Sequence, residues 1–283
     1  ANASSSEDQS GEGDSEDDTS ESEEETDTEA PTSNWPEALR FEISAVLVRD
    51  TEDRNPRAVP GGKGLVFRST RGKMEYLDFE SMETRVLFDH WDGWIDFDLS
   101  PDGEWMAYAQ HDLDFNSDIF LMRLDGSQAP INLTRHPDND EHPRFSADGR
   151  LLVFTSERKA EAYDIMVVAL DAEYDRLLEA DQEAYHDKAK KAAADHDHKK
   201  ANPNVWSWSL DDAWLRLRRL TTLDGDETSP WITPGGETIV FRGSGSHSGL
   251  HRIDWKGENR TKIGSGSVQG FSTDGKSLLR VDN

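Results

Sequence analysis

Ser100-Pro101-Asp102-Gly103 is the stretch that decides the fold, because variants of this tetrapeptide return along most of the chain. Proline presets φ at the second position, aspartate can accept hydrogen bonds from the backbone, and glycine adopts the left-handed conformation of a tight turn. A short apolar run after each turn predicts a strand. The other copies begin at Val59, Ser146, Thr233 and Ser272. These copies predict a repeat protein.

Two further segments keep a constant distance from the turns. An apolar segment starting at Asp118 lies 18 residues after Ser100, and the same 18 residues separate Asp164 from Ser146. A basic and apolar segment ends 12 residues before three of the turns, at Phe88, Thr134 and Thr221. The unit therefore has four strands in about 40 to 46 residues, which matches one blade of a β-propeller.

We expect an all-β protein, a β-propeller with about four four-stranded blades and partial blades at both ends. Val46-Leu47-Val48-Arg49 is similar in kind to the strand predicted at 217–220, which closes a blade. The chain should therefore begin inside one blade, and Asn283 follows the second strand of a new one. Residues 45–283 are accordingly interpreted as a partial β-propeller.

One blade carries 41 extra residues between its third and fourth strands. We assign 172–212 to this largely helical insertion, because apolar residues recur near helical spacing within 173–200. Acidic residues come early and lysines late, which complements a helix dipole. The segment is either a solvated surface helix or a lid or docking arm.

The N-terminal tract is strongly acidic. Residues 1–34 contain 13 acidic residues and no Lys or Arg, which predicts disorder, and we interpret 1–44 as the end of an insertion in a preceding blade. Of the net charge of −27, the remainder keeps −14, from 45 acidic and 31 basic residues. This charge argues against nucleic-acid binding.

Other features leave the compartment open between cytoplasm and periplasm. The sequence has no cysteine, no run of about 18 apolar residues that could span a membrane, and no secretory signal peptide. The true N-terminus is expected to be missing.

A search for chemistry assigns no catalytic, cofactor-binding or metal residue, since nucleophile-elbow, phosphate-loop and zinc motifs do not occur. Asp112, Asp114, Asn116 and Asp118 have the spacing that begins a calcium loop, but neither its glycine nor its closing glutamate follows. We favour a polar connection between strands in which Asp118 bonds backbone amides, and leave calcium open.

Histidines and tryptophans are the other candidates. The histidines of the insertion are expected to be solvated rather than metal ligands: His186, His196 and His198. Four tryptophans either stack on peptide in a channel or, as we favour, fill the wedge between blades: Trp94, Trp105, Trp231 and Trp255.

Three segments resemble the propeller repeats of the tricorn protease and its bacterial homologues: 100–108, 114–119 and 132–137. The helical insertion followed by 215–221 is also similar to those homologues. The resemblance covers about 45–283. It implies propellers that filter and guide peptides toward the active site of a serine-peptidase domain, which follows a PDZ domain. Those domains have no counterpart here, so no catalytic residue is carried over.

We therefore expect the non-catalytic propeller portion of a tricorn-like serine peptidase, a hydrolase involved in proteolysis, with peptides as partners and no cofactor. The alternative is a TolB-like propeller that binds a protein partner and has no enzymatic activity, because the Ser-Pro-Asp-Gly blade also occurs there. A third option is the propeller of a prolyl-oligopeptidase-like enzyme. The full open reading frame would separate these three.

Overall fold

The computed structural model describes residues 43–159, 162–194, 208–272 and 274–282. The chain divides into two units, Ala1–Arg49 and Asp50–Asn283, and the described strands all belong to the second unit. The tract 1–34, for which disorder is predicted, lies outside the described residues. In the described part, no helix is long and apolar enough to cross a membrane.

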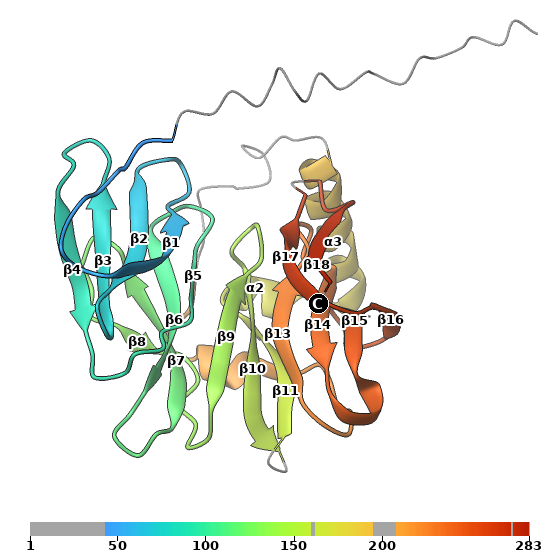
Figure 1. Ribbon diagram of the computed structural model, residues 1–283. Helices are drawn as coiled ribbons and strands as arrows, with labels where there is room; N and C mark the ends of the chain where they lie inside the picture. Colours follow the sequence, from blue (N-terminus) through green and yellow to red (C-terminus); the bar gives the residue numbers. More distant parts are fainter. Residues whose placement is uncertain (1–42, 160–161, 195–207, 273, 283) are drawn as a thin grey trace, which may run out of the picture. The chain divides into compact units, whose positions relative to one another are not determined.

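The described residues of the second unit form four sheets of four antiparallel strands and one sheet of two, and each sheet is a blade or part of one (Figure 1). Neighbouring strands in a sheet follow each other in the sequence. Blades 1 and 2 consist of β1 (Asp53–Ala58), β2 (Gly64–Ser69), β3 (Lys73–Asp78), β4 (Thr84–Asp89), β5 (Phe97–Leu99), β6 (Trp105–His111), β7 (Ser117–Arg123) and β8 (Ile131–Asn132). Blades 3 and 4 consist of β9 (Asp140–Phe145), β10 (Leu151–Lys159), β11 (Ala162–Ala169), β12 (Leu217–Arg219), β13 (Glu227–Ile232), β14 (Thr238–Gly243), β15 (Gly249–Asp254) and β16 (Thr261–Gly264). The predicted β-propeller is confirmed, and a partial fifth blade is formed by β17 (Ser267–Phe271) and β18 (Leu278–Val281).

The turn at Ser100 explains why its residues recur. The Ser100 hydroxyl accepts a hydrogen bond from the Trp105 amide at 2.9 Å, and the Gly103 amide donates to the Ser100 carbonyl at 2.8 Å. Asp102 accepts from the Glu104 amide at 2.9 Å. Gly103 has φ of +69°, and a Cβ there would lie 2.6 Å from the Pro60 carbonyl oxygen of the neighbouring blade. Glycine is therefore required by both conformation and space.

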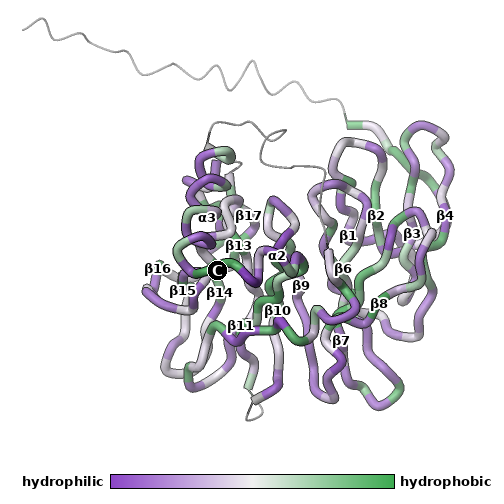
Figure 2. Tube along the Cα trace, turned by 180° about the vertical axis from the view of Figure 1, so that it is seen from behind, coloured by the Kyte–Doolittle hydropathy of each residue, from purple (hydrophilic) through white to green (hydrophobic). Residues whose placement is uncertain are grey.

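In the part of the chain that the structure describes, the hydrophobic core has three clusters, each shared by two neighbouring blades. In β10, Leu152 and Phe154 belong to the cluster shared with blade 2, whereas Leu151 and Val153 belong to the cluster shared with blade 4. Both faces of this strand are buried, which explains its continuous hydrophobic run (Figure 2).

The insertion in blade 3 is helical, as predicted, and packs against blade 4. It contains α2 (Ala172–Asp175) and α3 (Glu179–Ala194), and the 3-10 helix η1 (Ala213–Arg216) follows it directly before β12. Asp171 caps α2 by accepting from the Glu173 amide at 2.8 Å. The α3 helix also carries ion pairs to blade 4, with Lys256 Nζ 2.5 Å from Glu179 Oε1.

The expectation that His186 is solvated is wrong. This side chain is 2% exposed, its Nδ1 lies 3.0 Å from the Gly235 carbonyl oxygen, and its Nε2 lies 2.7 Å from the Tyr174 hydroxyl. Because a carbonyl only accepts, Nδ1 carries the proton and Nε2 accepts from tyrosine. Burial lowers the pKa of His186, which favours this neutral form. The other two histidines, His196 and His198, lie outside the described residues.

The strand expected at 46–49 does not form, so that no partial blade precedes blade 1 in the described part of the chain. Residues 43–52 contain no strand. Val46 and Val48 are exposed. Apolar pattern alone therefore overestimates the β-structure at this position.

Candidate functional site

The blades have two ends with different connections. We call the end with the connections after first and third strands, such as 100–104 and 124–130, the turn face. The other end, with connections such as 112–116 within blade 2 and 133–139 between blades, is the loop face. The insertion also leaves blade 3 at the turn face, because it follows the third strand, β11.

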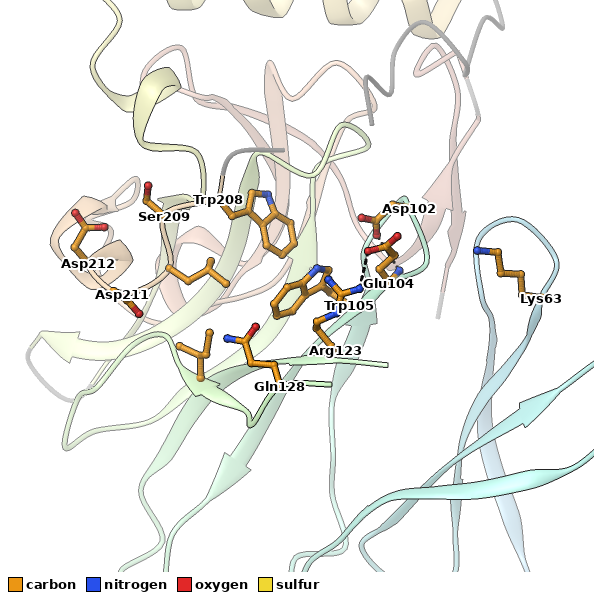
Figure 3. Close-up of a pocket in the computed structure, with 12 residues that line it drawn as sticks. Lys63, Asp102, Glu104, Trp105, Arg123, Gln128, Trp208, Ser209, Asp211 and Asp212 are labelled. Carbon is orange, nitrogen blue, oxygen red and sulfur yellow. Dashed lines mark hydrogen bonds and ion pairs between the residues drawn. The ribbon is translucent and has the colours of Figure 1, made fainter. Parts of the chain in front are cut away.

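A pocket of about 1020 Å³ lies on the turn face of blade 2 (Figure 3). Its walls come from the turn of blade 1, from the turn and strands of blade 2, and from the segment that returns from the insertion to blade 3. The lining residues are Lys63, Asp102, Glu104, Trp105, Arg123, Gln128, Ile131, Trp208, Ser209, Leu210, Asp211 and Asp212.

Two tryptophans form the aromatic part of the wall. The rings of Trp105 and Trp208 lie 5.3 Å apart, and Trp208 also stacks on Phe145 at 5.9 Å with an interplanar angle of 8°. The indole nitrogen of Trp208 donates to the Gly149 carbonyl at 3.0 Å. Trp208 is therefore fixed by packing on one side and by a hydrogen bond on the other, while it still lines the pocket.

Charged groups surround these rings. Arg123 lies 5.3 Å from the centre of the Trp105 ring, and its Nη2 is 3.0 Å from Glu104 and 3.2 Å from Asp125. The pKa of Asp125 is held well below its usual range by hydrogen bonds from Ser127 and Arg123. Asp212 likewise forms an ion pair with Arg216 at 2.6 Å. The lining holds four carboxylates, Asp102, Glu104, Asp211 and Asp212, and two cations, Lys63 and Arg123.

The four residues with calcium-like spacing do not share one set of partners. Asp112 accepts hydrogen bonds from the amides of Asp114 and Asn116 at 2.8 and 3.0 Å, within its own loop. Asp118 lies in β7, where it accepts from the Thr134 hydroxyl, the Asn132 amide group and the His136 backbone amide. Among the described residues no group of three or more metal-binding side chains is found.

The four candidate tryptophans have different environments. Trp255 is 6% exposed in the cluster between blades 3 and 4, and Trp105 packs at the edge of the cluster between blades 2 and 3. Trp231 lies under the Arg144 guanidinium at 5.3 Å. Trp94 is 81% exposed on the loop face, so it does not fill a wedge between blades.

Sequence reasoning missed Trp208 as a site residue. Its partners Gly149 and Phe145 lie about 60 residues earlier in the chain, so local pattern cannot reveal them. The available signal is its position near the end of the insertion, nine residues before the apolar and basic strand that closes blade 3.

A hydroxyl that donates its hydrogen to an imidazole can be activated as a nucleophile, so the direction of the contact between Thr155 and His142 matters. His142 Nδ1 lies 2.9 Å from Thr155 Oγ1, but that hydroxyl donates to the Glu141 carbonyl at 3.1 Å. The imidazole therefore acts as donor to the hydroxyl and does not take its proton. The contact is consistent with a structural role.

No protein-family model matches the sequence, and no curated protein matches it. Among solved structures, the chain is similar to the tricorn protease, with 15% identity and a TM-score of 0.59, over 81% of this chain and 24% of that one. It is also similar to TolB from Acinetobacter baumannii, with 18% identity and a TM-score of 0.55, over 82% of this chain and 49% of that one. The chain thus spans about a quarter and about half of these proteins, and what it shares with them is the β-propeller fold.

Proposed function

We propose that this chain is the non-catalytic propeller part of a tricorn-like serine peptidase and that it binds peptides on their way to an active site in the parent protein. The observation that carries the proposal is the pocket walled by Trp105 and Trp208. PDZ and peptidase domains in the same parent protein belong to this proposal.

The pocket suits a short extended peptide. Its volume of about 1020 Å³ is at the upper end of the range of ligand pockets, roughly 300–1,000 Å³, and leaves room for several side chains. Indole faces bind apolar and cationic side chains, and Gln128 and Ser209 can hydrogen-bond a peptide backbone. A ready-made pocket of this kind reduces the entropy cost of binding.

The charge of the site favours cationic peptides. Glu104 pairs with Arg123 and Asp212 with Arg216, so that Asp102 and Asp211 remain in the lining against one cation, Lys63. The net charge of −27 also attracts cationic ligands over longer distances. Lys and Arg beside an apolar side chain are therefore the expected peptide features.

A binding assay with labelled nine-residue peptides tests the proposal. A peptide with Lys and Arg around Leu and Phe should bind at least about tenfold tighter than the same peptide with Glu in place of the basic residues. Asp211→Lys reverses an exposed charge in the lining and should weaken binding of the basic peptide by a similar factor. Mass spectrometry should show both peptides intact, because the proposal assigns no peptidase activity to this chain.

Trp208→Phe is the second variant, since it keeps an aromatic ring but removes the indole surface. Trp214→Phe is its matched control, because Trp214 is 43% exposed and does not line the pocket. Equal binding by the two variants would overturn the pocket as the peptide site. Cleavage that copurifies with the chain would overturn the non-catalytic assignment.

The alternative, a TolB-like propeller that binds a protein partner, is supported by the similarity to TolB at nearly the same TM-score. The reading frame distinguishes the two proposals. A serine-peptidase domain encoded in frame after this segment supports the first, and a stop codon without such a domain supports the second.

A further inference from the structure

A second candidate surface lies on the loop face, at the junction of blades 1 and 2. Trp91, Leu113 and Phe115 are 39%, 84% and 68% exposed, and we call these three residues the aromatic patch. The rings of Trp91 and Phe115 meet edge to face at 5.4 Å. Apolar side chains exposed together on a surface mark interaction sites, and tryptophan is enriched among the residues that carry binding energy.

The loop that carries Trp91 is tied firmly to blade 2. Asp92, which is 7% exposed, accepts a hydrogen bond from the Trp94 amide at 3.0 Å. Its other oxygen lies 2.6 Å from His111 Nδ1, at the end of β6. The first bond lies within the connection between the blades, and the second joins that connection to β6, so the loop that carries Trp91 is anchored before a partner binds.

The loop that carries Phe115 is equally well defined. Asp112 accepts from the amides of Asp114 and Asn116, and its own amide donates to the Asn116 carbonyl at 2.8 Å. Phe115 has φ of +67°, a left-handed conformation that is unfavourable for a bulky residue and free of strain for glycine. Glycine would adopt this conformation without strain, so the backbone of the loop does not require a phenyl ring at this position.

Blade 4 shows that the fold does not need apolar residues in this connection. There β14 and β15 are joined by Ser244-Gly245-Ser246-His247-Ser248, which has the same five residues in length as Asp112–Asn116 and contains no apolar side chain. The aromatic patch is therefore a local addition to the blade repeat.

The charges around the aromatic patch indicate the charge that a partner would carry. Segments 89–96 and 111–117 contain five aspartates and neither Lys nor Arg. Asp92 is buried and in contact with His111, whereas Asp89, Asp112 and Asp114 are exposed. Two arginines of blade 1 lie against this connection: Arg68 is 5.7 Å from the centre of the Trp94 ring and donates to the Gly93 carbonyl, and the Arg71 side chain lies beside Gly93. The charge beside Gly93 and Trp94 is therefore mixed, whereas the exposed charges in the loop of Phe115 are the two carboxylates Asp112 and Asp114.

We propose that the aromatic patch docks a cationic amphipathic segment of a partner protein, with an apolar side chain against Trp91 and Phe115 and Lys or Arg beside Asp112 and Asp114. Nucleic acid and anionic membranes carry the wrong charge for this surface. A second copy of this chain, with a net charge of −27, is also repelled. This surface is separate from the pocket on the turn face.

The test uses the full chain and a labelled 14-residue peptide of Leu, Phe and Lys, with a matched peptide that has Glu for Lys. The Lys peptide should bind, and the Glu peptide should bind at least tenfold more weakly. Phe115→Gly should weaken binding of the Lys peptide about tenfold while the melting temperature stays the same or rises. Asp114→Lys should weaken binding at low salt, with the difference shrinking at 0.5 M salt.

Two controls separate this surface from other sites. Phe79→Ala removes an aromatic residue that is 38% exposed on the turn face and should leave binding unchanged. Asp211→Lys, in the turn-face pocket, is the second control. The loss of Lys-peptide binding caused by Phe115→Gly should be the same with and without Asp211→Lys. The two proposals can therefore fail independently of each other. Wild-type binding by Phe115→Gly, equal binding of the Glu peptide, or a lowered melting temperature of Phe115→Gly would overturn the proposal.

Discussion

The pocket on the turn face and the aromatic patch on the loop face both contain aromatic side chains, but these side chains differ in burial and in their effect on stability. At the turn face, Trp208 packs on Phe145 and donates to Gly149, so the wall of the pocket is also part of the core between blades 2 and 3. At the loop face, Phe115 is exposed in a left-handed conformation. The pocket is therefore coupled to stability, whereas the aromatic patch is maintained at a small cost to it.

The largest expected effect tests this difference directly. Trp208→Ala removes the stacking on Phe145 and the hydrogen bond to Gly149, and should lower the free energy of unfolding by about 3 kcal/mol. Phe115→Gly relieves the left-handed strain and should leave that free energy unchanged or raise it by up to about 1 kcal/mol. Urea denaturation of the two variants measures both values. Similar losses in the two variants would mean that the loop-face residue is structural after all.

The blades could be predicted from the sequence because their determinants are local. Ser100 and Gly103 form the hydrogen bonds of the turn with residues at most five positions away, so the repeat can be recognised from the sequence alone. The helical insertion can be recognised for the same reason, from the helical spacing of its apolar residues and from its acidic start and lysine-rich end.

What the sequence could not supply depends on contacts distant in the chain. His186 sits among lysines and looks solvated, but its partner Gly235 lies 49 residues away on blade 4. The pocket needs Trp208 beside Trp105, which are about a hundred residues apart. The spacing of Asp112 and Asp114 favours a polar connection and leaves calcium open, but it does not reveal that Asp112 accepts from the amides of the turn that presents Phe115.

A second prediction concerns the insertion, which lies on the turn face with the pocket. Burial lowers the pKa of His186. At pH values below about 6.5, His186 therefore binds a proton in the unfolded chain but stays neutral in the native chain. The contribution of His186 to stability is therefore complete above pH 6.5 and falls as the pH drops toward its lower native value. His186→Gln should lower the free energy of unfolding at pH 7.5 by about 1–3 kcal/mol and remove part of this pH dependence.

His247→Gln is the matched control, because His247 is half-buried at a position where its backbone carbonyl, and not its ring, accepts the hydrogen bond from His251. Urea denaturation at pH 7.5 and 5.5 compares the three proteins. An unchanged pH dependence in His186→Gln would show that the imidazole is not held neutral by its contacts with Tyr174 and Gly235.

The smallest expected effect comes from a buried carboxylate at the loop end of the blades. Asp140 and Glu227 each begin the first strand of a blade and are 0% and 1% exposed. Arg158 lies 2.9 Å from Asp140, twelve residues after Ser146, but the residue twelve positions after Thr233 is Gly245. Glu227 therefore has no arginine at the corresponding position, and burial together with the nearby charge of Asp164 raises its pKa to about 7.

The sign of the effect follows from which state holds the proton. Between about pH 4.5 and 7 the unfolded chain has lost the Glu227 proton while the native chain keeps it, so this group makes stability decline as the pH rises through that window. Glu227→Gln cannot ionise and should be more stable than the wild type above pH 7, with the advantage shrinking toward pH 5. Asp140→Asn should have the opposite result at neutral pH, since it leaves Arg158 without its ion pair. Thermal melts of both variants at pH 5 and 8 measure this, and a Glu227→Gln variant less stable than the wild type at pH 8 would show that the carboxylate is ionised and paired in the native chain.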